Sequence, residues 1–268
     1  MAFMHKAAAV VAAFFVSVAA FAATPSVTDR TKYEQVLVPM FFLQVVPGAN
    51  GSLWQTEFTG RNGGSTDVVA FQTAGDGVEP TILAGGQTFH IRPRRDYLNP
   101  ANPGVFLYIE RERAASVTYT LRLRELSQSP FDFLEVPVVH ERDFSSSTTN
   151  LLDVPTNTAT RAHLRIYGAS SSNGHADVIV RIFGNDAKLY EKTVTLTPAG
   201  GLATVPTDSA FMNNPAYAEL ANLRQLPGIG AHDIVRVEIE PASPGLRYWS
   251  FISVTNNATQ RVSTITPQ

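Results

Sequence analysis

An alternation of apolar and polar side chains with period two recurs along this chain and constrains its fold more than any other feature. Trp54, Thr56 and Phe58, for example, stand at every second position of one segment. The same period occurs at 105–110, 117–124, 164–167, 178–183 and 235–240. Successive side chains of a strand point to opposite faces of a sheet. Each segment is therefore predicted to be a strand with one apolar and one more polar face, as in antiparallel sheets.

Glycine-rich turn signals separate these segments. They are Asn62-Gly63-Gly64, Gly75-Asp76-Gly77, Gly85-Gly86, Asn173-Gly174, Gly184-Asn185-Asp186 and Gly200-Gly201. Glycine and asparagine tolerate the positive φ angles that tight turns need. Many short strands joined by such turns predict an all-β protein built as a sandwich or barrel.

The segment 214–227 allows two interpretations. Asn214 can cap a helix whose first position is Pro215, with Tyr217 and Leu220 on one side. Alternatively, 216–220 forms a short strand followed by a loop. We favour a connection with at most one or two helical turns.

The first 22 residues have the pattern of a cleaved signal peptide. Lys6 gives a short positive start, 7–19 is an apolar run without charge, and Ala20-Phe21-Ala22 fits a cleavage site. The alternative is a membrane anchor, but the run is shorter than the ~20 residues that span a bilayer. We expect removal of 1–22 and a mature chain without a transmembrane anchor. The predicted location is the periplasm or the extracellular space.

Composition excludes several classes of function. The chain has no cysteine among its 268 residues, which rules out disulfides, zinc–thiolate sites and a cysteine nucleophile. This absence in an exported protein favours a bacterial source. The formal net charge of −2 gives no basic surface for nucleic acid.

The mature chain shows an internal repeat of pattern. A shift of 130 residues places 105–124 on 235–254 without a gap. At shorter offsets, Val38-Pro39 matches Val136-Pro137, and 54–58 matches 162–166. We therefore predict two tandem antiparallel β-sandwich domains, at 30–128 and 129–268, with the boundary near Gln128–Pro130. Because proline cannot donate to a ladder, the strands with Pro39 and Pro137 are expected to be edge strands or to break there.

Four segments carry a resemblance to a known group of proteins. They are Val46-Pro47-Gly48-Ala49-Asn50-Gly51-Ser52-Leu53-Trp54, His140-Glu141-Arg142-Asp143-Phe144, Leu164-Arg165-Ile166-Tyr167 and 249–259, which reads WSFISVTNNAT. In these segments the chain resembles a group of secreted bacterial proteins of unknown function with tandem immunoglobulin-like (Ig-like) sandwiches. The resemblance implies this fold and export, and it implies no activity, ligand or catalytic residue.

The candidate chemical site is the cluster of His140, Glu141 and Asp143. An imidazole and two carboxylates can bind a divalent ion or transfer protons. In an extended chain, however, His140 and Glu141 point to opposite faces, and the spacing matches no metalloprotease motif. We therefore predict no catalytic residue, cofactor or metal, and these three residues remain weak candidates.

Other groups are weaker still. His175 and Asp177 can share a strand face, and Asp67, Asp76 and Glu79 fit no calcium-loop spacing. No G-x-S-x-G or phosphate-binding motif occurs. The arginines at 92, 94, 95, 111, 113, 122 and 124 are interleaved with acids, which favours paired charges on a solvated face over an anionic polysaccharide site.

The strand expected at 247–254 has two apolar faces. If Trp249 and Phe251 fill the core, then Tyr248, Ile252 and Val254 form a possible interaction face, because large apolar patches are rare on monomers. We expect this face to be covered from within the chain, by domain 1 or by 199–232, rather than by a partner.

The favoured function is a non-enzymatic structural or binding module of the cell envelope or extracellular space. Its partner is expected to be a protein or a glycan. Trp54, Tyr97, Tyr167 and Tyr217 can stack on sugars, although the alternation around Trp54 favours a core position. The alternative is a hydrolase of extracellular polymers with its site at His140, Glu141 and Asp143.

Overall fold

The computed structural model describes residues 29–41, 45–48, 51–74, 77–90, 104–127, 133–169, 175–198 and 214–268. The predicted signal peptide, 1–22, lies outside these residues. No helix within the described ranges is long and apolar enough to span a membrane.

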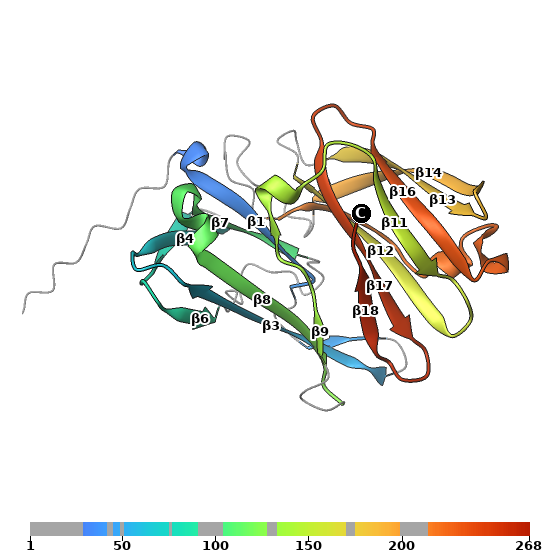
Figure 1. Ribbon diagram of the computed structural model, residues 1–268, viewed down its shortest axis with the longest axis horizontal. Coiled ribbons are helices and arrows are strands. Elements are labelled where there is room, and N and C mark those ends of the chain that lie inside the picture. The colour runs from blue at the N-terminus through green and yellow to red at the C-terminus, as the bar shows by residue number, and fades with distance from the viewer. Residues whose placement is uncertain are drawn as a thin grey trace, which may run out of the picture.

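The described chain is all-β, and its strand pairs are antiparallel (Figure 1). The strands are β1 (Tyr33–Pro39), β2 (Val46–Pro47), β3 (Leu53–Asn62), β4 (Val68–Ala74), β5 (Gly77–Leu83), β6 (Thr88–His90), β7 (Gly104–Glu110), β8 (Val117–Glu125), β9 (Phe133–Glu135), β10 (Val139–His140), β11 (Thr149–Pro155), β12 (Thr160–Ala169), β13 (Ala176–Gly184), β14 (Ala187–Pro198), β15 (Ala216–Leu220), β16 (Ile234–Pro241), β17 (Arg247–Asn256) and β18 (Val262–Ile265). Short 3₁₀ turns are η1 (Arg30–Lys32), η3 (Arg111–Ser116), η4 (Glu141–Asp143), η5 (Leu223–Gln225) and η6 (Ile229–Ala231).

Three sheets contain these strands. The first has the order β10-β1-β7-β4-β5, and the second has the order β2-β3-β8-β9 with β6 paired to β3. The third has eight strands in the order β11-β16-β13-β14-β15-β12-β17-β18. Figure 1 shows the first two sheets in one half of the molecule and the third in the other half.

The eight-stranded sheet folds around its own core. Its strand β14 pairs with β13 over most of its length, and near its end Thr197 and Pro198 pair with β15. This pairing joins two four-stranded parts into a nearly barrel-like sheet. Alternate residues such as Val178, Val180 and Ile182 are fully buried in it.

The alternation predicted the second sheet correctly. In β3, Phe58, Gly60 and Asn62 are buried. In β8, Leu121 and Leu123 are buried, while Arg122 and Arg124 are partly exposed. The arginines on the outer face of β8 pair with acids, as expected: Arg122 with Glu135 at 3.4 Å and Arg124 with Glu57 at 2.8 Å.

The first sheet differs from the prediction of one solvated face. Every residue of β1 is buried, and in β7 only Glu110 is partly exposed. The reason is that further apolar groups cover these strands. The Phe144 ring lies 6.4 Å from that of Phe106, and Tyr167 of β12 approaches Gly104 so closely that a Cβ there would be 3.1 Å from Tyr167 Cε1.

The structure also decides three local questions. Strand β1 ends at Pro39, and the apolar run around Pro137 is broken between β9 and β10, as the prolines predicted. The segment 214–227 takes the strand alternative, because β15 pairs with β12, and η5 follows it. The change from the first two sheets to the third lies between His140 and Thr149. It comes later than the expected boundary at Gln128–Pro130, since β9 and β10 pair with β8 and β1.

Candidate functional site

The structure separates the three side chains of the predicted chemical site. His140 ends β10, and Glu141 and Asp143 lie in η4. His140 Nδ1 lies 3.1 Å from Glu34 Oε1, whereas Glu141 Oε2 lies 2.9 Å from Arg111. Asp143 is 54% exposed, and its ion pair with Arg142 is long, at 4.0 Å. The three groups therefore do not converge on one ligand.

Glu141 joins segments from both halves of the chain. Its carboxylate accepts a hydrogen bond from the Gln35 backbone N–H at 3.1 Å and pairs with Arg111, Arg30 at 3.4 Å and Arg247 at 3.7 Å. Burial alone would raise its pKa, but the Gln35 N–H and the guanidinium groups outweigh burial and lower it. Glu141 is thus held as an anion between cations from both halves of the chain.

The sequence analysis missed Glu34, the buried partner of His140. Its side chain is 6% exposed and also pairs with Arg142 at 3.2 Å. The signal was present, because Glu34 is an acid within the otherwise largely apolar segment 33–39. A buried carboxylate needs such partners to offset its lost hydration.

The face predicted for interaction is part of the core instead. Tyr248 and Ile252 are fully buried, and Val254 is 7% exposed, all within the core of the eight-stranded sheet. Trp249 and Phe251 point the other way and belong to the core cluster of the first two sheets. The sequence analysis therefore exchanged the core face and the outer face of β17. The outer face carries Trp249 and Phe251, and other parts of this chain cover it.

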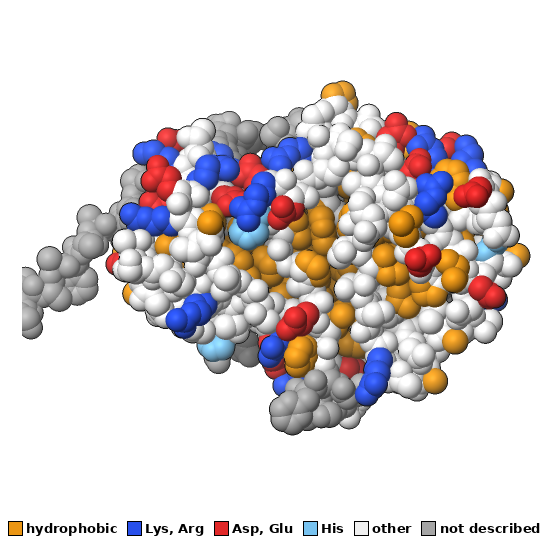
Figure 2. All heavy atoms as spheres, in the orientation of Figure 1, with side chains coloured by type: hydrophobic (Ala, Val, Ile, Leu, Met, Phe, Trp, Pro, Cys, Tyr) orange, Lys and Arg blue, Asp and Glu red, His pale blue; other side chains and the backbone are white. Residues whose placement is uncertain are grey.

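An aromatic cluster fills the junction between the two halves. Tyr167 stacks on Phe251 with ring centroids 6.3 Å apart, and Trp249 stacks on Phe251 at 5.2 Å. All three come from β12 and β17, yet they pack with residues of β1 and β7. Figure 2 shows apolar side chains gathered along this junction, with charged groups around them.

The outer face of β12 and β15 also carries polar side chains. Glu219 Oε1 lies 3.1 Å from His163 Nδ1 and 3.3 Å from Arg165, and Tyr217 donates a hydrogen bond to Glu219 Oε2 at 2.8 Å. Burial opposes ionisation of Glu219, but these partners lower its pKa to about 2. Burial raises the pKa of Tyr217 and of Tyr167, so both phenols stay neutral. His163 thus belongs to a polar cluster around Glu219, in which its Nδ1 has a partner.

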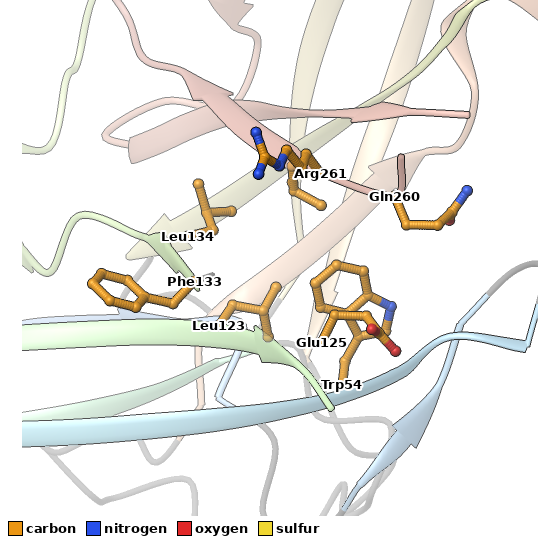
Figure 3. Close-up of a pocket in the computed structure, with 8 residues that line it drawn as sticks. Trp54, Leu123, Glu125, Phe133, Leu134, Gln260 and Arg261 are labelled. Carbon is orange, nitrogen blue, oxygen red and sulfur yellow. The ribbon is translucent and has the colours of Figure 1, made fainter. Parts of the chain in front are cut away.

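Two cavities lie near the junction. The first, of about 230 Å³, is lined by Trp54, Leu123, Glu125, Phe133, Leu134, Gln260, Arg261 and Val262. Figure 3 shows the Trp54 ring and Leu123 on one side of it, with Arg261 on the opposite side. Trp54 is half-buried and packs against the core of the first sheets, in agreement with its alternation.

The second cavity, of about 310 Å³, brings together two residues that the sequence analysis named separately, Asp143 and Tyr248. Its other lining residues are Pro137, Ser145, Thr149, Trp249, Ser250, Thr266 and Pro267. No sequence signal could have placed the C-terminal residues beside η4, because only the strand order brings these segments together.

The remaining candidates that the structure describes lie apart from one another. Asp177 accepts a hydrogen bond from Thr195, His175 is exposed, and Asp67 accepts from the Gly85 N–H. Residues 92, 94, 95, 97 and 76, and the side chain of Glu79, lie outside the described part. Within that part, no group of three or more His, Asp or Glu side chains could hold a metal ion.

Comparison with known proteins gives little further information. No family model and no curated protein matches the chain. Among solved structures, T=1 particles derived from infectious bursal virus show a TM-score of 0.26 and 11% identity, over 89% of this chain and 70% of that chain. A TM-score of this size does not indicate a shared fold.

Proposed function

We propose that the chain is an exported, non-enzymatic module of the cell envelope or extracellular space, made of two tandem Ig-like β-sandwiches. In this proposal, β1–β10 form the first sandwich and β11–β18 the second. The module binds a partner or serves as a structural element, and Glu141 contributes to the contact between its two halves.

Strand pairing supports the duplication. In the first half β7 lies between β1 and β4, and in the second half β16 lies between β11 and β13. Likewise, β3 lies between β8 and β6, and β12 lies between β17 and β15. The hairpins β4–β5 and β13–β14 correspond, as do the pairs β8–β9 and β17–β18.

This correspondence refines the repeat read from the sequence. It keeps two matches, 105–124 on 235–254 and 54–58 on 162–166. It replaces the third, because Val38-Pro39 ends β1 and the equivalent strand β11 ends with Val154-Pro155 rather than at Val136-Pro137.

The observation that carries the functional proposal is the way in which the two halves are joined. Of the candidate site residues, Glu141 pairs with Arg111 of the first half and with Arg247 of the second, whereas His140 contacts Glu34 within the first half. The aromatic cluster of Tyr167, Trp249 and Phe251 is buried there as well. A chain that uses these groups to fix two sandwiches in one arrangement suits a rigid binding or structural module better than a hydrolase.

Expression of the full chain in a bacterium tests the export part of the proposal. We expect a periplasmic or secreted product whose mass corresponds to a first residue of Ala23. As a control, replacing the apolar run 7–19 with polar residues should retain the precursor in the cytoplasm. A product that keeps Met1 and stays in the cytoplasm would contradict the proposal.

Small-angle scattering of the mature chain tests the rigid joining of the halves. One conformation should account for the profile, and the Glu141→Gln variant should loosen it, because three arginines then lose their shared anion. A profile that requires many relative positions of the two halves in the unchanged protein would contradict the proposal.

A further inference from the structure

The cavity of about 230 Å³ lies between the second sheet and the turn that joins β17 to β18. Trp54 of β3, Leu123 of β8 and Leu134 of β9 form one part of its wall. Val262, which begins β18, and Arg261 before it form another part. Both halves of the chain therefore build this cavity, and Figure 3 shows Trp54 and Leu123 on the side opposite Arg261.

The apolar wall of this cavity is only partly buried. Leu123 is 4% exposed, whereas Trp54, Leu134 and Val262 keep an intermediate exposure. Apolar surface that a concave site leaves in contact with water gains free energy when an apolar group covers it. A cavity of about 150 Å³ holds one benzene molecule. The volume here is therefore enough for one ring with a short substituent.

Side chains around this cavity are held in place by contacts within the chain. The indole N–H of Trp54 donates to Ser52 Oγ at 3.0 Å, which orients the ring. The Gln260 amide donates to the Asn257 carbonyl at 2.7 Å and accepts from Arg161 at 3.1 Å. A preformed site loses little conformational freedom when a ligand binds, so these contacts favour binding.

The charged lining residues determine which end group a ligand can carry. Glu125 is 3% exposed, and its carboxylate accepts hydrogen bonds from the backbone N–H groups of Leu53 at 2.9 Å and Ser127 at 3.0 Å. Its oxygens therefore serve the fold. Arg261 is exposed and is the only cation among the described lining residues. A guanidinium group has five N–H donors, so Arg261 can bind a carboxylate in addition to its contacts within the chain.

Other classes of ligand fit the described lining less well. A sugar needs many hydrogen-bonding partners, and no Ser, Thr, Asn or Tyr is among the described lining residues. A calcium or magnesium ion needs several oxygen ligands, and Glu125 supplies the only carboxylate there. A cationic ligand would be repelled by Arg261. An apolar ring with a negative end group agrees with all of these features.

We propose that this cavity binds a small aromatic carboxylate. The ring of the ligand packs against Trp54, Leu134 and Val262, and its carboxylate pairs with the Arg261 guanidinium. The proposal goes beyond the module described above, because a small-molecule site at the junction requires neither export nor a protein or glycan partner.

Tryptophan fluorescence of the mature chain tests whether the cavity is occupied. The chain has two tryptophans, Trp54 in the cavity wall and Trp249, which is 8% exposed in the aromatic cluster. Titration with phenylacetate or 3-phenylpropionate should change the emission saturably. The change should disappear in Trp54→Phe, which keeps an aromatic ring in the wall. An emission that neither carboxylate changes, or a change that persists in Trp54→Phe, would overturn the proposal.

Matched ligands test the end group by calorimetric titration. Phenylacetamide and phenethylamine keep the ring without the carboxylate, whereas acetate keeps the carboxylate without the ring. Phenylacetate should bind about fivefold more tightly than the amide, which is the scale of an exposed ion pair. Its affinity should fall as the salt concentration rises, because salt screens such a pair. Equal or tighter binding of the amide, the amine or acetate would contradict the assignment of the ligand.

Matched variants locate the site. Arg261→Gln should weaken phenylacetate binding about fivefold and leave phenylacetamide binding unchanged. Val262→Phe should abolish binding of both by filling the cavity, and its melting temperature without ligand shows whether it is folded. Lys192→Gln, which removes an exposed charge of β14 outside the cavity, is the control and should bind normally. Phenylacetate affinity that is unchanged in Arg261→Gln and in folded Val262→Phe would overturn the inference.

Failure of this proposal and failure of the proposed function are distinguishable. If no aromatic carboxylate binds while the chain is exported and rigid, the cavity proposal fails and the module remains. If the chain stays in the cytoplasm, the module proposal fails whatever binds in the cavity.

Discussion

Replacement of Phe251 by alanine tests whether the aromatic cluster joins the two halves. Phe251 is fully buried on the outer face of β17, where it stacks on Tyr167 and Trp249 and lies under the Arg165 guanidinium, 5.9 Å from the ring centroid. Its neighbour in sequence, Ile252, is also fully buried but points into the core of the eight-stranded sheet. The two residues therefore form a matched pair on one strand.

The expected cost of Phe251→Ala is large. Truncating a buried phenylalanine costs about 3–5 kcal/mol through lost burial and the cavity left behind. Each stacked aromatic pair adds about 0.5–1.5 kcal/mol beyond burial. We expect a loss near the upper end, about 4–5 kcal/mol, which is a substantial part of the ~5–15 kcal/mol stability of a typical protein. Phe251→Leu, which keeps most of the volume, should cost about 1–2 kcal/mol and remain folded.

Urea unfolding gives the magnitude, and hydrogen exchange measured by mass spectrometry gives the location. In Phe251→Leu, backbone exchange should rise in β1 and β7 as well as in β17, because the side chain packs in their shared cluster. In Ile252→Val, exchange should rise in β12, β13 and β16 and stay unchanged in β1 and β7. Equal exchange of β1 and β7 in both variants would refute the reasoning that Phe251 couples the halves.

Three further predictions concern single residues. Glu219→Gln should lower the free energy of unfolding at pH 7 by about 1 kcal/mol after allowance for solvent screening. The pKa of Glu219 in the folded protein is about 2, below its usual 4.5. The stability difference, measured by urea unfolding, should therefore vanish as the pH falls from about 4.5 toward 2. Asn62→Ala should cost about 3 kcal/mol by urea unfolding, because its fully buried amide donates to the carbonyls of Thr66 and Leu83. Gly60→Ala should cost about 1–3 kcal/mol by thermal unfolding, because a Cβ there would lie 2.2 Å from the Phe89 ring.

Each of these three predictions would be contradicted by a particular result. A stability difference for Glu219→Gln that persists unchanged at pH 2 would mean that its ionisation contributes nothing. Unchanged stability of Asn62→Ala would mean that water replaces the amide. For Gly60→Ala, an unaltered melting temperature would show that the Phe89 ring moves aside without cost.

Local pattern was enough to identify strands but not to identify which faces they bury. The alternation in β3 and β8 marks their inner residues because their outer faces meet solvent. In β17 both faces are apolar, and the sequence alone gave no reason to choose between Tyr248 and Trp249 as the core residue. The choice depends on the first two sheets, whose core includes the outer face of β12 and β17. The strands of those sheets lie far from β17 in the sequence.

For the candidate site, too, the sequence showed which residues are adjacent in the chain but not which partners they contact. His140, Glu141 and Asp143 are adjacent in the chain, so the sequence suggested a shared site. The turn η4 directs them to different partners, and those partners, Glu34 and Arg247, come from opposite ends of the chain. Asp143 alone reaches a cavity, and that cavity needs residues from the C-terminal end.

The sequence by itself determined an all-β, antiparallel protein, the position of most strands and their turns, and a recurrence of pattern between its halves. These features depend on side-chain periodicity and on glycine and proline, which act over a few residues. Only the tertiary structure decided how the halves meet, which aromatic residues fill the junction, and that Asp143 lies near the C-terminal residues Thr266 and Pro267. Such contacts join residues that lie far apart in the chain, and their free energy depends on packing geometry that local pattern does not contain.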